Sequence, residues 1–407
     1  SFTKSNASLP SLTTEEVVFL GYGIDDPAYS DYDGVDVDGK VILIYQGEPM
    51  TLDSVSHISG SKELSEWATD WRKKLRAAKS KGVTTVLFIE RNVKFWTTRY
   101  AYRLTNPTLM IAHKDQSQEF ANSLYISPDV AKNIIGKRYE KVLETRDNIN
   151  ATGQPAHVEL KCKIEIRQAE QRLDVSGENV LGFIEGSDPD LKNELLVVSA
   201  HYDHLGKRGG DIFNGADDNA SGTSALMELA QAFAEAKKQA QGPKRSVLLM
   251  AVSGEEKGLL GSEHYVYDPR FPLEQTVANI NIDMIGRVDR HHQDNPQYIY
   301  VIGADRLSTQ LHDIIVEQNE TYTNLFLDYT YNEEDDPNRY YYRSDHYNFA
   351  ERGIPAAFFF SGTHKDYHRK TDTAEKLDYD RMQSIARLAF HTVWELANRP
   401  DRIVVDK

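Results

Sequence analysis

The sequence predicts an α/β protein built on a mainly parallel mixed sheet with helices on both faces, together with a smaller α/β domain. Three observations support this fold class. Short, nearly continuous apolar runs recur along the chain, as expected of strands buried on both faces of a parallel sheet. Amphipathic helical patterns separate these runs. A polar, turn-rich segment at residues 148–155 divides the chain into two parts.

The bulk composition excludes several classes of function. The 407 residues carry a net charge of −15, which argues against a nucleic-acid partner because phosphate binding needs clustered Lys and Arg. No apolar stretch approaches the ~18 residues that a membrane span requires. The single cysteine, Cys162, excludes an intrachain disulfide and a cysteine-rich zinc site, so metal ligands must be His and carboxylates. The chain starts at Ser1 without an initiator Met, and we expect a processed or shortened product. The oligomeric state is left open.

The first part of the chain is predicted to be a short lead-in followed by a small α/β domain. Residues 1–12 are polar and rich in turn formers, and residues 13–153 form the domain. A helical pattern over 67–80 ends before Lys81-Gly82. The predicted strands of this domain cover residues 17–20, 41–45 and 85–89. No residue in it has the spacing of a metal ligand, so we expect it to supply neither a ligand nor a proton-transfer group.

The second predicted domain, residues 154–407, has the clearer periodicity. Its helices are expected over 223–237, where Leu226 begins an apolar stripe, and over 379–397. An alternating pattern at 158–167 predicts its first strand. The further predicted strands cover residues 179–185, 195–200, 246–252, 280–282, 298–302 and 355–360.

Polar residues with metal-binding side chains follow several of these strands directly. His201 follows the strand at 195–200, and Glu255-Glu256 follow the strand at 246–252. Asp283 follows 280–282, and a loop after 355–360 reaches His368. A further loop, Gly215-Ala216-Asp217-Asp218-Asn219-Ala220-Ser221-Gly222, precedes the helix at 223–237. Ligands of open α/β sheets bind just beyond the carboxyl ends of the strands, so we expect these side chains to converge.

Each of these residues alone has an ordinary explanation. A His after a strand is more often a loop residue than a ligand, and the Asp217-Asp218 segment has the composition of a helix N-terminal cap. Glu255-Glu256 could be two solvated charges. Together, however, they would concentrate negative charge on one edge of one sheet, which costs energy unless a cation neutralises it.

Mixed His and carboxylate ligands favour Zn²⁺, with Co²⁺ or Mn²⁺ as substitutes. The number of candidate ligands fits two metal ions that share one carboxylate and lower the pKa of a water between them. A carboxylate next to the metals must then remain free to accept the proton of the water. Glu255 and Glu256 are neighbours at a strand end, so one can bind metal while the other acts as the base.

At these residues the sequence resembles the co-catalytic zinc peptidases, a family that includes secreted bacterial leucyl-type aminopeptidases, glutamate carboxypeptidase, the transferrin-receptor ectodomain and, more distantly, glutaminyl cyclase. The similarity covers roughly residues 175–377. The matching blocks occur in the order of the family: Ser199-Ala200-His201-Tyr202-Asp203, the Gly215–Gly222 loop, Glu255-Glu256-Lys257-Gly258, Asn281-Ile282-Asp283-Met284 and Asp366-Tyr367-His368.

The resemblance implies a role for each matching residue. The bridging carboxylate would be Asp218. His201 and Asp283 would complete one metal site, and Glu256 and His368 the other.

Three further residues receive roles from the same resemblance. Glu255 would be the general base, and Asp203 would orient His201. The segment Tyr340-Tyr341-Tyr342-Arg343-Ser344-Asp345-His346 resembles the stretch that supplies a tyrosine to the oxyanion. Tyr341 is in the best register, and Tyr340 and Tyr342 would be packing residues.

The resemblance also implies a zinc exopeptidase fold and a metallopeptidase activity. We expect a hydrolase that releases N-terminal amino acids from peptides with a free N-terminus, using two zinc ions per chain. Three alternatives stay open: a glutaminyl cyclase, disfavoured because its single-zinc site does not need His201; a carboxypeptidase for acidic residues, with Arg339 or Arg343 binding carboxylate; and a non-catalytic receptor-like scaffold.

Residues 13–153 resemble the protease-associated domain inserted in many of these peptidases. The similar segments are Tyr22-Gly23-Ile24, Asp38-Gly39-Lys40-Val41-Ile42-Leu43, and a pattern from Ala77 to Phe88. We expect this domain to shape or cover the cleft. Export from the cytoplasm, to the periplasm, the cell surface or the medium, is implied by the resemblance as well.

Overall fold

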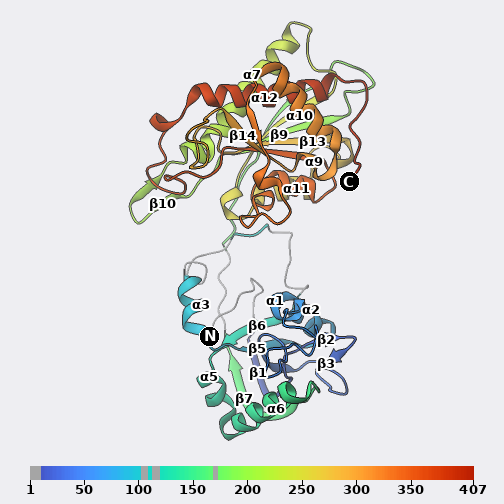
Figure 1. The fold of residues 1–407 in the computed structure, drawn as a ribbon, viewed down its shortest axis with the longest axis vertical. Coiled ribbons are helices and arrows are strands. Elements are labelled where there is room, and N and C mark those ends of the chain that lie inside the picture. Colours follow the sequence, from blue (N-terminus) through green and yellow to red (C-terminus); the bar gives the residue numbers. More distant parts are fainter. Residues whose placement is uncertain (1–10, 102–108, 112–119, 168–172) are drawn as a thin grey trace. The chain divides into compact units, whose positions relative to one another are not determined.

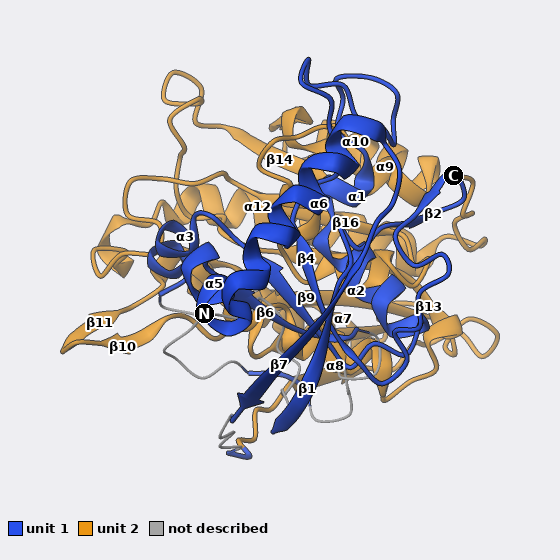
Figure 2. Ribbon diagram, turned by 90° about the horizontal axis from the view of Figure 1, so that it is seen from below, with its two compact units in different colours: residues 1–174 blue, residues 175–407 orange. Residues whose placement is uncertain are grey.

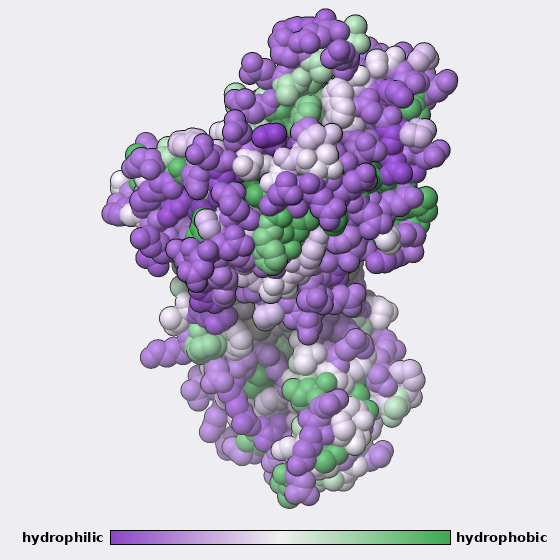
Figure 3. Space-filling model, turned by 45° about the horizontal axis from the view of Figure 1, so that its top comes forward, coloured by the Kyte–Doolittle hydropathy of each residue, from purple (hydrophilic) through white to green (hydrophobic). Residues whose placement is uncertain are grey.

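The computed structural model describes residues 11–101, 109–111, 120–167 and 173–407. The chain divides into two compact units, Ser1–Asp174 and Val175–Lys407, which Figure 2 distinguishes by colour. On the face drawn in Figure 3 both units are mostly hydrophilic, with small hydrophobic patches between polar side chains. Among the described helices, none has both the length and the apolar character needed to cross a membrane.

Unit 1 contains a five-stranded sheet in the order β6-β5-β4-β1-β7. Its first four strands along this order are parallel, and β7 runs antiparallel to β1. Apolar side chains cover both faces of the sheet and form two separate core clusters. The strands are β1 (Leu12–Phe19), β4 (Val41–Tyr45), β5 (Thr85–Ile89), β6 (Asn122–Ile126) and β7 (Val158–Ile166), with a small hairpin of β2 (Asp25–Asp26) and β3 (Tyr29–Ser30). The helices are α1 (Glu66–Thr69), α2 (Trp71–Ser80), α3 (Val93–Arg99), α5 (Pro128–Ile135) and α6 (Tyr139–Thr152).

The boundary between the units lies between Asp174 and Val175, and the boundary expected after residue 153 is wrong. Gly153 does end α6 in a left-handed conformation, as its turn-rich surroundings suggested. The chain then returns to the same sheet, because β7 pairs along β1 from Phe19↔Val158 to Leu12↔Ile166. Residues 158–166, expected to form the first strand of the second domain, therefore form the last strand of the unit 1 sheet. The lead-in is shorter than expected, since Leu12 already belongs to β1; residues 1–10 lie outside the described residues.

The helix predicted over 67–80 is divided in two by Asp70. This residue has an extended backbone, with φ −106° and ψ 97°, and its carboxylate accepts a hydrogen bond from the Arg72 N–H. Asp70 thus caps α2 at the point where α1 ends, which the apolar pattern on either side could not indicate.

Unit 2 is built on a seven-stranded mixed sheet in the order β15-β14-β16-β13-β9-β12-β8. The central strands β12, β9, β13 and β16 are parallel, whereas β8 and β14 pair antiparallel with their neighbours β12 and β16. This arrangement confirms the predicted fold class. The strands are β8 (Val180–Ile184), β9 (Leu195–His201), β12 (Ser246–Val252), β13 (Thr276–Ile282), β14 (Tyr298–Ile302), β15 (Phe326–Asp328) and β16 (Ala356–Phe360), with a hairpin of β10 (Gly206–Arg208) and β11 (Asp211–Phe213).

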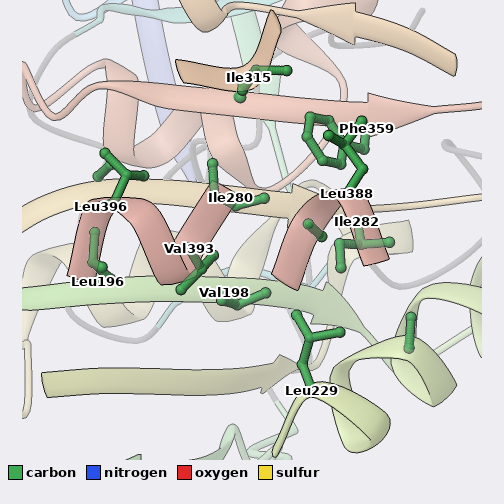
Figure 4. Close-up of a cluster of buried hydrophobic side chains, with 14 of the residues drawn as sticks. Leu196, Val198, Leu229, Ile280, Ile282, Ile315, Phe359, Leu388, Val393 and Leu396 are labelled. Carbon is green, nitrogen blue, oxygen red and sulfur yellow. The ribbon is translucent and has the colours of Figure 1, made fainter. Parts of the chain in front are cut away.

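Helices cover both faces of this sheet (Figure 1). Alternate residues of β9 point to opposite faces. Leu196 and Val198 pack in the cluster that contains α7, α10 and α12, whereas Leu195 and Val197 pack in the cluster that contains α8 and α11. Figure 4 shows the first cluster, in which Leu229 and Val393 come from helices and Val198 from the sheet. The helices are α7 (Gly222–Lys238), α8 (Leu260–Tyr267), α9 (Ala304–Leu307), α10 (Thr309–Tyr322), α11 (His346–Ala350) and α12 (Tyr379–Asn398).

Candidate metal centre

The five predicted ligands all lie at the carboxyl edge of the unit 2 sheet. His201 is the last residue of β9, and Asp283 directly follows β13. Asp218 lies in an irregular helical turn, Ala216–Ser221, that leads into α7. Glu256 lies in a short 3₁₀ turn after β12, and His368 lies in the loop after β16. Because the central strands are parallel, their ends bring residues far apart in sequence to one place.

Asp218 is the centre of this group, and its two oxygen atoms face two different histidines. Asp218 Oδ1 lies 3.3 Å from His201 Nε2, and Asp218 Oδ2 lies 3.1 Å from His368 Nε2. His201 Nε2 also lies 3.4 Å from Asp283 Oδ1, and His368 Nε2 lies 3.4 Å from Glu256 Oε1. The arrangement is that of one shared carboxylate with a His–carboxylate pair on each side.

Several of these atoms are buried without a hydrogen-bonding partner. Among the described residues, His201 Nε2, Glu256 Oε1 and Asp283 Oδ1 have no hydrogen bond. Buried polar atoms are almost always satisfied, so unsatisfied nitrogen and oxygen atoms facing one another fit ligands of a cation. The His and carboxylate donor set fits zinc.

The carboxylates and imidazoles of this group lie close together and shift one another's pKa values. Burial alone would raise the pKa of Asp218, but the imidazole rings of His201 and His368, whose nitrogens lie beside its oxygens, lower it below its ordinary value. Burial alone would likewise raise the pKa of Glu256, which the neighbouring rings of His204 and His368 lower to about 2. Burial opposes protonation of His368, but Asp218 and Glu256 raise its pKa to about 9.

The pKa of Glu255 is raised, whereas the pKa values of Asp218 and Glu256 are lowered. Burial raises its pKa well above the ordinary range, and the positive charge of His201 only partly compensates. Its carboxylate lies 4.0 Å from His201 Nε2, and Glu255, His201 and Asp283 have ligand atoms within 4.8 Å of one another. Glu255 therefore lies beside the first His–carboxylate pair, in a setting that favours its protonated form.

Asp203 contacts His201 and Glu255 in a way that differs in detail from the expectation. His201 Nδ1 is 3.0 Å from the backbone carbonyl oxygen of Asp203 and 3.8 Å from its carboxylate. The carboxylate instead accepts the backbone N–H of Glu255 at 3.1 Å. Asp203 thus fixes the His201 ring through its backbone and the Glu255 turn through its side chain.

His204 was missed by the sequence reasoning. Its Nδ1 atom lies 2.8 Å from Glu256 Oε1 and 3.8 Å from Asp218 Oδ2, and these three residues form a second compact group of ligand atoms. The available signal was its position three residues after His201 in the same loop. That spacing has no fixed geometry outside a helix, so it did not identify a partner.

Asp217, the neighbour of Asp218, points to other partners. Its Oδ1 atom accepts the Gly286 N–H at 2.6 Å, and its Oδ2 atom lies 3.1 Å from His364 Nε2. The backbone N–H groups of Asp217 and Asp218 both donate to the Asp372 carboxylate. These contacts hold the turn that presents Asp218.

The structure does not bring Tyr341 to this centre, and the expectation for it is corrected. Its ring lies 4.7 Å from the Arg306 guanidinium and 5.5 Å from the His346 ring, and Tyr341 is not among the residues that line the pocket next to the carboxylates. A pocket of about 180 Å³ next to the carboxylates is lined by Tyr340 and Tyr367 instead. The Tyr367 ring stacks on the His368 ring at 3.8 Å. The remaining lining residues are Asp218, Glu255, Glu256, Asp283, Met284, Arg343, Phe358, Phe360, Thr363 and His368.

Comparison with protein families matches residues 179–393 to peptidase family M28. The chain belongs to this family. The matched range contains every predicted ligand and every residue that lines the pocket. The match confirms the resemblance drawn from the sequence motifs. Within the described part of this M28 chain, both groups of potential metal-binding atoms lie in unit 2.

Individual relatives are more distant. The M28 chain is similar to a protein named probable zinc metalloprotease from Pyricularia oryzae, with 27% identity over 55% of this chain and 51% of the relative. It is similar to the aminopeptidase YwaD of Bacillus subtilis, with 26% identity over 62% of this chain and 50% of the relative. The chain therefore spans about half the length of these curated relatives. A solved aminopeptidase from Aneurinibacillus sp. strain AM-1 is similar with a TM-score of 0.48 and 19% identity, over 98% of this chain and 78% of that chain.

Proposed function

We propose that this M28 chain is a zinc-dependent aminopeptidase that releases amino acids from the N-terminus of peptides. The observation that carries the proposal is the placement of the two Asp218 oxygens against two separate His–carboxylate pairs. The names of the relatives, a zinc metalloprotease and an aminopeptidase, support both the metal and the reaction.

The proposed ligand sets follow from the distances. Asp218 would bridge, with His201 and Asp283 completing one site and Glu256 and His368 the other. His204, at 2.8 Å from Glu256, would orient the Glu256 carboxylate. Two zinc ions bound there would polarise the scissile carbonyl and acidify a water, with Co²⁺ or Mn²⁺ as substitutes.

Glu255 is the proposed general base. It lies in the pocket beside His201 and Asp283, with its carboxylate 4.0 Å from His201 Nε2, within reach of a water held at this site. The hydrogen bond from its backbone N–H to Asp203 fixes the turn that carries it. Glu255 would take the proton of the attacking water and pass it to the leaving amine.

Tyr367 replaces Tyr341 as the proposed donor to the oxyanion. Its ring is held against His368, and its hydroxyl lies 3.4 Å from Arg343 Nη2 at the pocket wall. Burial raises the pKa of Tyr367, and the neighbouring charge of Asp218 raises it further, so the hydroxyl keeps its proton and can donate a hydrogen bond.

Metal analysis combined with a panel of aminoacyl p-nitroanilides tests this function. We expect about two zinc ions per chain, loss of activity on chelation, and recovery with zinc, cobalt or manganese. A stoichiometry that stays at one zinc in excess metal would contradict the two-metal site. Failure of the metal-loaded protein to cleave any N-terminal substrate would contradict the aminopeptidase.

Unit 1 is proposed to be a protease-associated-like domain without a chemical role in hydrolysis. Its described residues contain none of the groups of His, Cys, Asp and Glu that could hold a metal. Export from the cytoplasm also stays a proposal. Cell fractionation of the native host would test it.

A further inference from the structure

Arg343 brings a positive charge to a pocket otherwise dominated by carboxylates. It follows the turn Tyr340–Tyr342, and its backbone N–H donates to the Tyr340 carbonyl oxygen at 3.0 Å. Its guanidinium carbon lies 4.9 Å from the centre of the Tyr340 ring. Its Nη2 atom donates to the Tyr367 hydroxyl oxygen at 3.4 Å. Two tyrosines of the pocket wall therefore hold the guanidinium in place.

No carboxylate of the described residues pairs with this guanidinium. Two cations that line the neighbouring pocket are paired, by contrast: Arg287 lies 3.1 Å from Asp366, and Lys376 also lies 3.1 Å from Asp366. No described acidic group lies within 4.0 Å of the Arg343 nitrogens, although Asp218 and Glu256 line the same pocket. Those two carboxylates face His368 and His204 instead.

A guanidinium in this position has a clear chemical preference. It keeps its charge at any physiological pH and offers several N–H donors in a planar fork, a geometry that matches a carboxylate. Arg343 lines the same pocket as the proposed ligands and Glu255, so a substrate group that reaches Arg343 belongs to a residue close to the scissile bond.

We propose that Arg343 binds a carboxylate of the substrate, so that this site favours peptides carrying a negative charge next to the scissile bond. This inference rests on the proposed peptidase function. Two sources offer the same chemistry: an acidic side chain beside the cleaved bond, or the free C-terminus of a dipeptide. Arg339 is the alternative cation on the same turn, but it lies over the Tyr342 ring at 4.7 Å and is not part of the pocket wall.

Matched peptide pairs distinguish the sources. The zinc-loaded protein is assayed with Leu-Leu against Leu-Leu-amide, Glu-Leu-amide against Gln-Leu-amide, and Leu-Glu-amide against Leu-Gln-amide. We expect kcat/KM to favour the charged member of at least one pair by about tenfold or more, since hydrogen bonds to charged groups contribute that much. The favoured pair identifies the position of the carboxylate.

Arg343→Met should remove this preference, and Arg343→Lys should keep part of it. Arg339→Met is the matched control, because it deletes a guanidinium over a neighbouring tyrosine outside the pocket, and it should keep the preference. The loss should appear mainly in KM. Dissociation constants of the same peptides, measured by calorimetry in the Glu255→Gln background, should lose the same preference on Arg343→Met.

Three results would overturn the inference. Equal cleavage of all charged and neutral partners by the wild type would exclude a carboxylate site while leaving the peptidase function intact. An equal fall in kcat for charged and neutral peptides in Arg343→Met would make Arg343 a positioning residue for Tyr367. Absence of cleavage of every peptide would overturn both the peptidase function and this inference.

Discussion

At the scale of single residues, the shared carboxylate has the strictest chemical requirement. An amide at position 218 would keep the shape of Asp218 but would carry no charge between two cations. We predict that Asp218→Asn loses most of its bound zinc and its activity, measured as metal content and kcat on the same preparation. Asp217→Asn is the matched control, since Asp217 accepts from Gly286 and faces His364. It should lower stability by about 1–3 kcal/mol through its buried contacts and retain metal. A reversal of the two phenotypes would mean that Asp217 is the bridge.

Glu255 and Glu256 are adjacent in sequence but differ in the role that we propose. Glu255→Gln preserves size and hydrogen bonding but cannot accept a proton, so we predict a fall in kcat of about 10²–10⁴-fold with little change in KM. Its zinc content should be unchanged. Glu256→Gln, which alters a proposed ligand, should lose zinc together with rate. Atomic absorption and steady-state kinetics on both variants check this pair. If only Glu255→Gln lost zinc, Glu255 would be the metal ligand and Glu256 the base.

The hydroxyl of Tyr367 is expected to act only in the transition state. Tyr367→Phe retains the ring that stacks on His368 and removes the donor, so kcat should fall by about 10²-fold, in the range of a lost oxyanion donor. Tyr341→Phe should have almost no effect, because that ring packs against Arg306. Steady-state kinetics on the two variants decide between the tyrosines. Equal losses would argue for a packing role in both.

Four of the five proposed ligands could be predicted because each one sits where a parallel strand ends or a helix begins, whereas His368, in the loop after β16, was assigned from the resemblance of Asp366-Tyr367-His368 to the family. His201, Glu256 and Asp283 follow strands whose apolar runs are unmistakable, and parallel strands place their ends together. His204 and Tyr367 could not be assigned in this way. Their positions depend on loop conformation, and neither apolar periodicity nor strand register constrains a loop. Tyr341 was chosen from its register in the motif, and register likewise does not determine which side chain of the turn Tyr340–Tyr342 lines the pocket.

At the scale of elements, buried apolar runs predicted the strands well and their partners poorly. The predicted strands at 41–45, 85–89, 246–252 and 298–302 have the observed bounds. The strand at 158–167 was also located, but its alternating pattern does not say which sheet it joins. Its pairing with β1 joins segments that are far apart in the sequence, and local sequence patterns do not determine such a pairing. The interruption of the predicted helix at Asp70 is determined locally, by one side chain that caps α2.

The buried side chain of Arg381 joins the start of helix α12 to the sheet by hydrogen bonds. The Arg381 side chain donates to the carbonyl oxygens of Pro296 and, at 2.7 Å, of Tyr298, and to Ser361 Oγ at 3.1 Å. Ser361 directly follows β16, on the way to His368.

Loss of this attachment should be costly. We predict that Arg381→Met lowers the free energy of unfolding by at least about 2 kcal/mol, because buried acceptors lose their donors. Arg387→Met, on an exposed position of the same helix, should change it by less than about 0.5 kcal/mol. Urea unfolding of both variants checks the difference, and equal stabilities would show that these hydrogen bonds add nothing net.

At the scale of the whole molecule, metal should stabilise one unit more than the other. The proposed ligands all belong to unit 2, and a ligand that binds only the folded state stabilises it by mass action. We predict that chelation lowers hydrogen-exchange protection of backbone amides in β9 and β13. Protection in β4 and β5 of unit 1 should stay the same. Loss of protection in β4 and β5 would indicate a metal ligand in unit 1.

The pairing of β7 with β1 also has a consequence for the folding of unit 1 during synthesis. β1 carries β4 on one side and β7 on the other, so a ribosome that has just released residue 153 has exposed a chain whose β1 would be an unpaired edge. Unpaired edges recruit other strands and lead to aggregation. The sheet of unit 1 has all five of its strands only when residues 158–166 have emerged. We therefore expect β1 to stay open to pairing with other chains until β7 covers it and becomes the outer strand of the sheet.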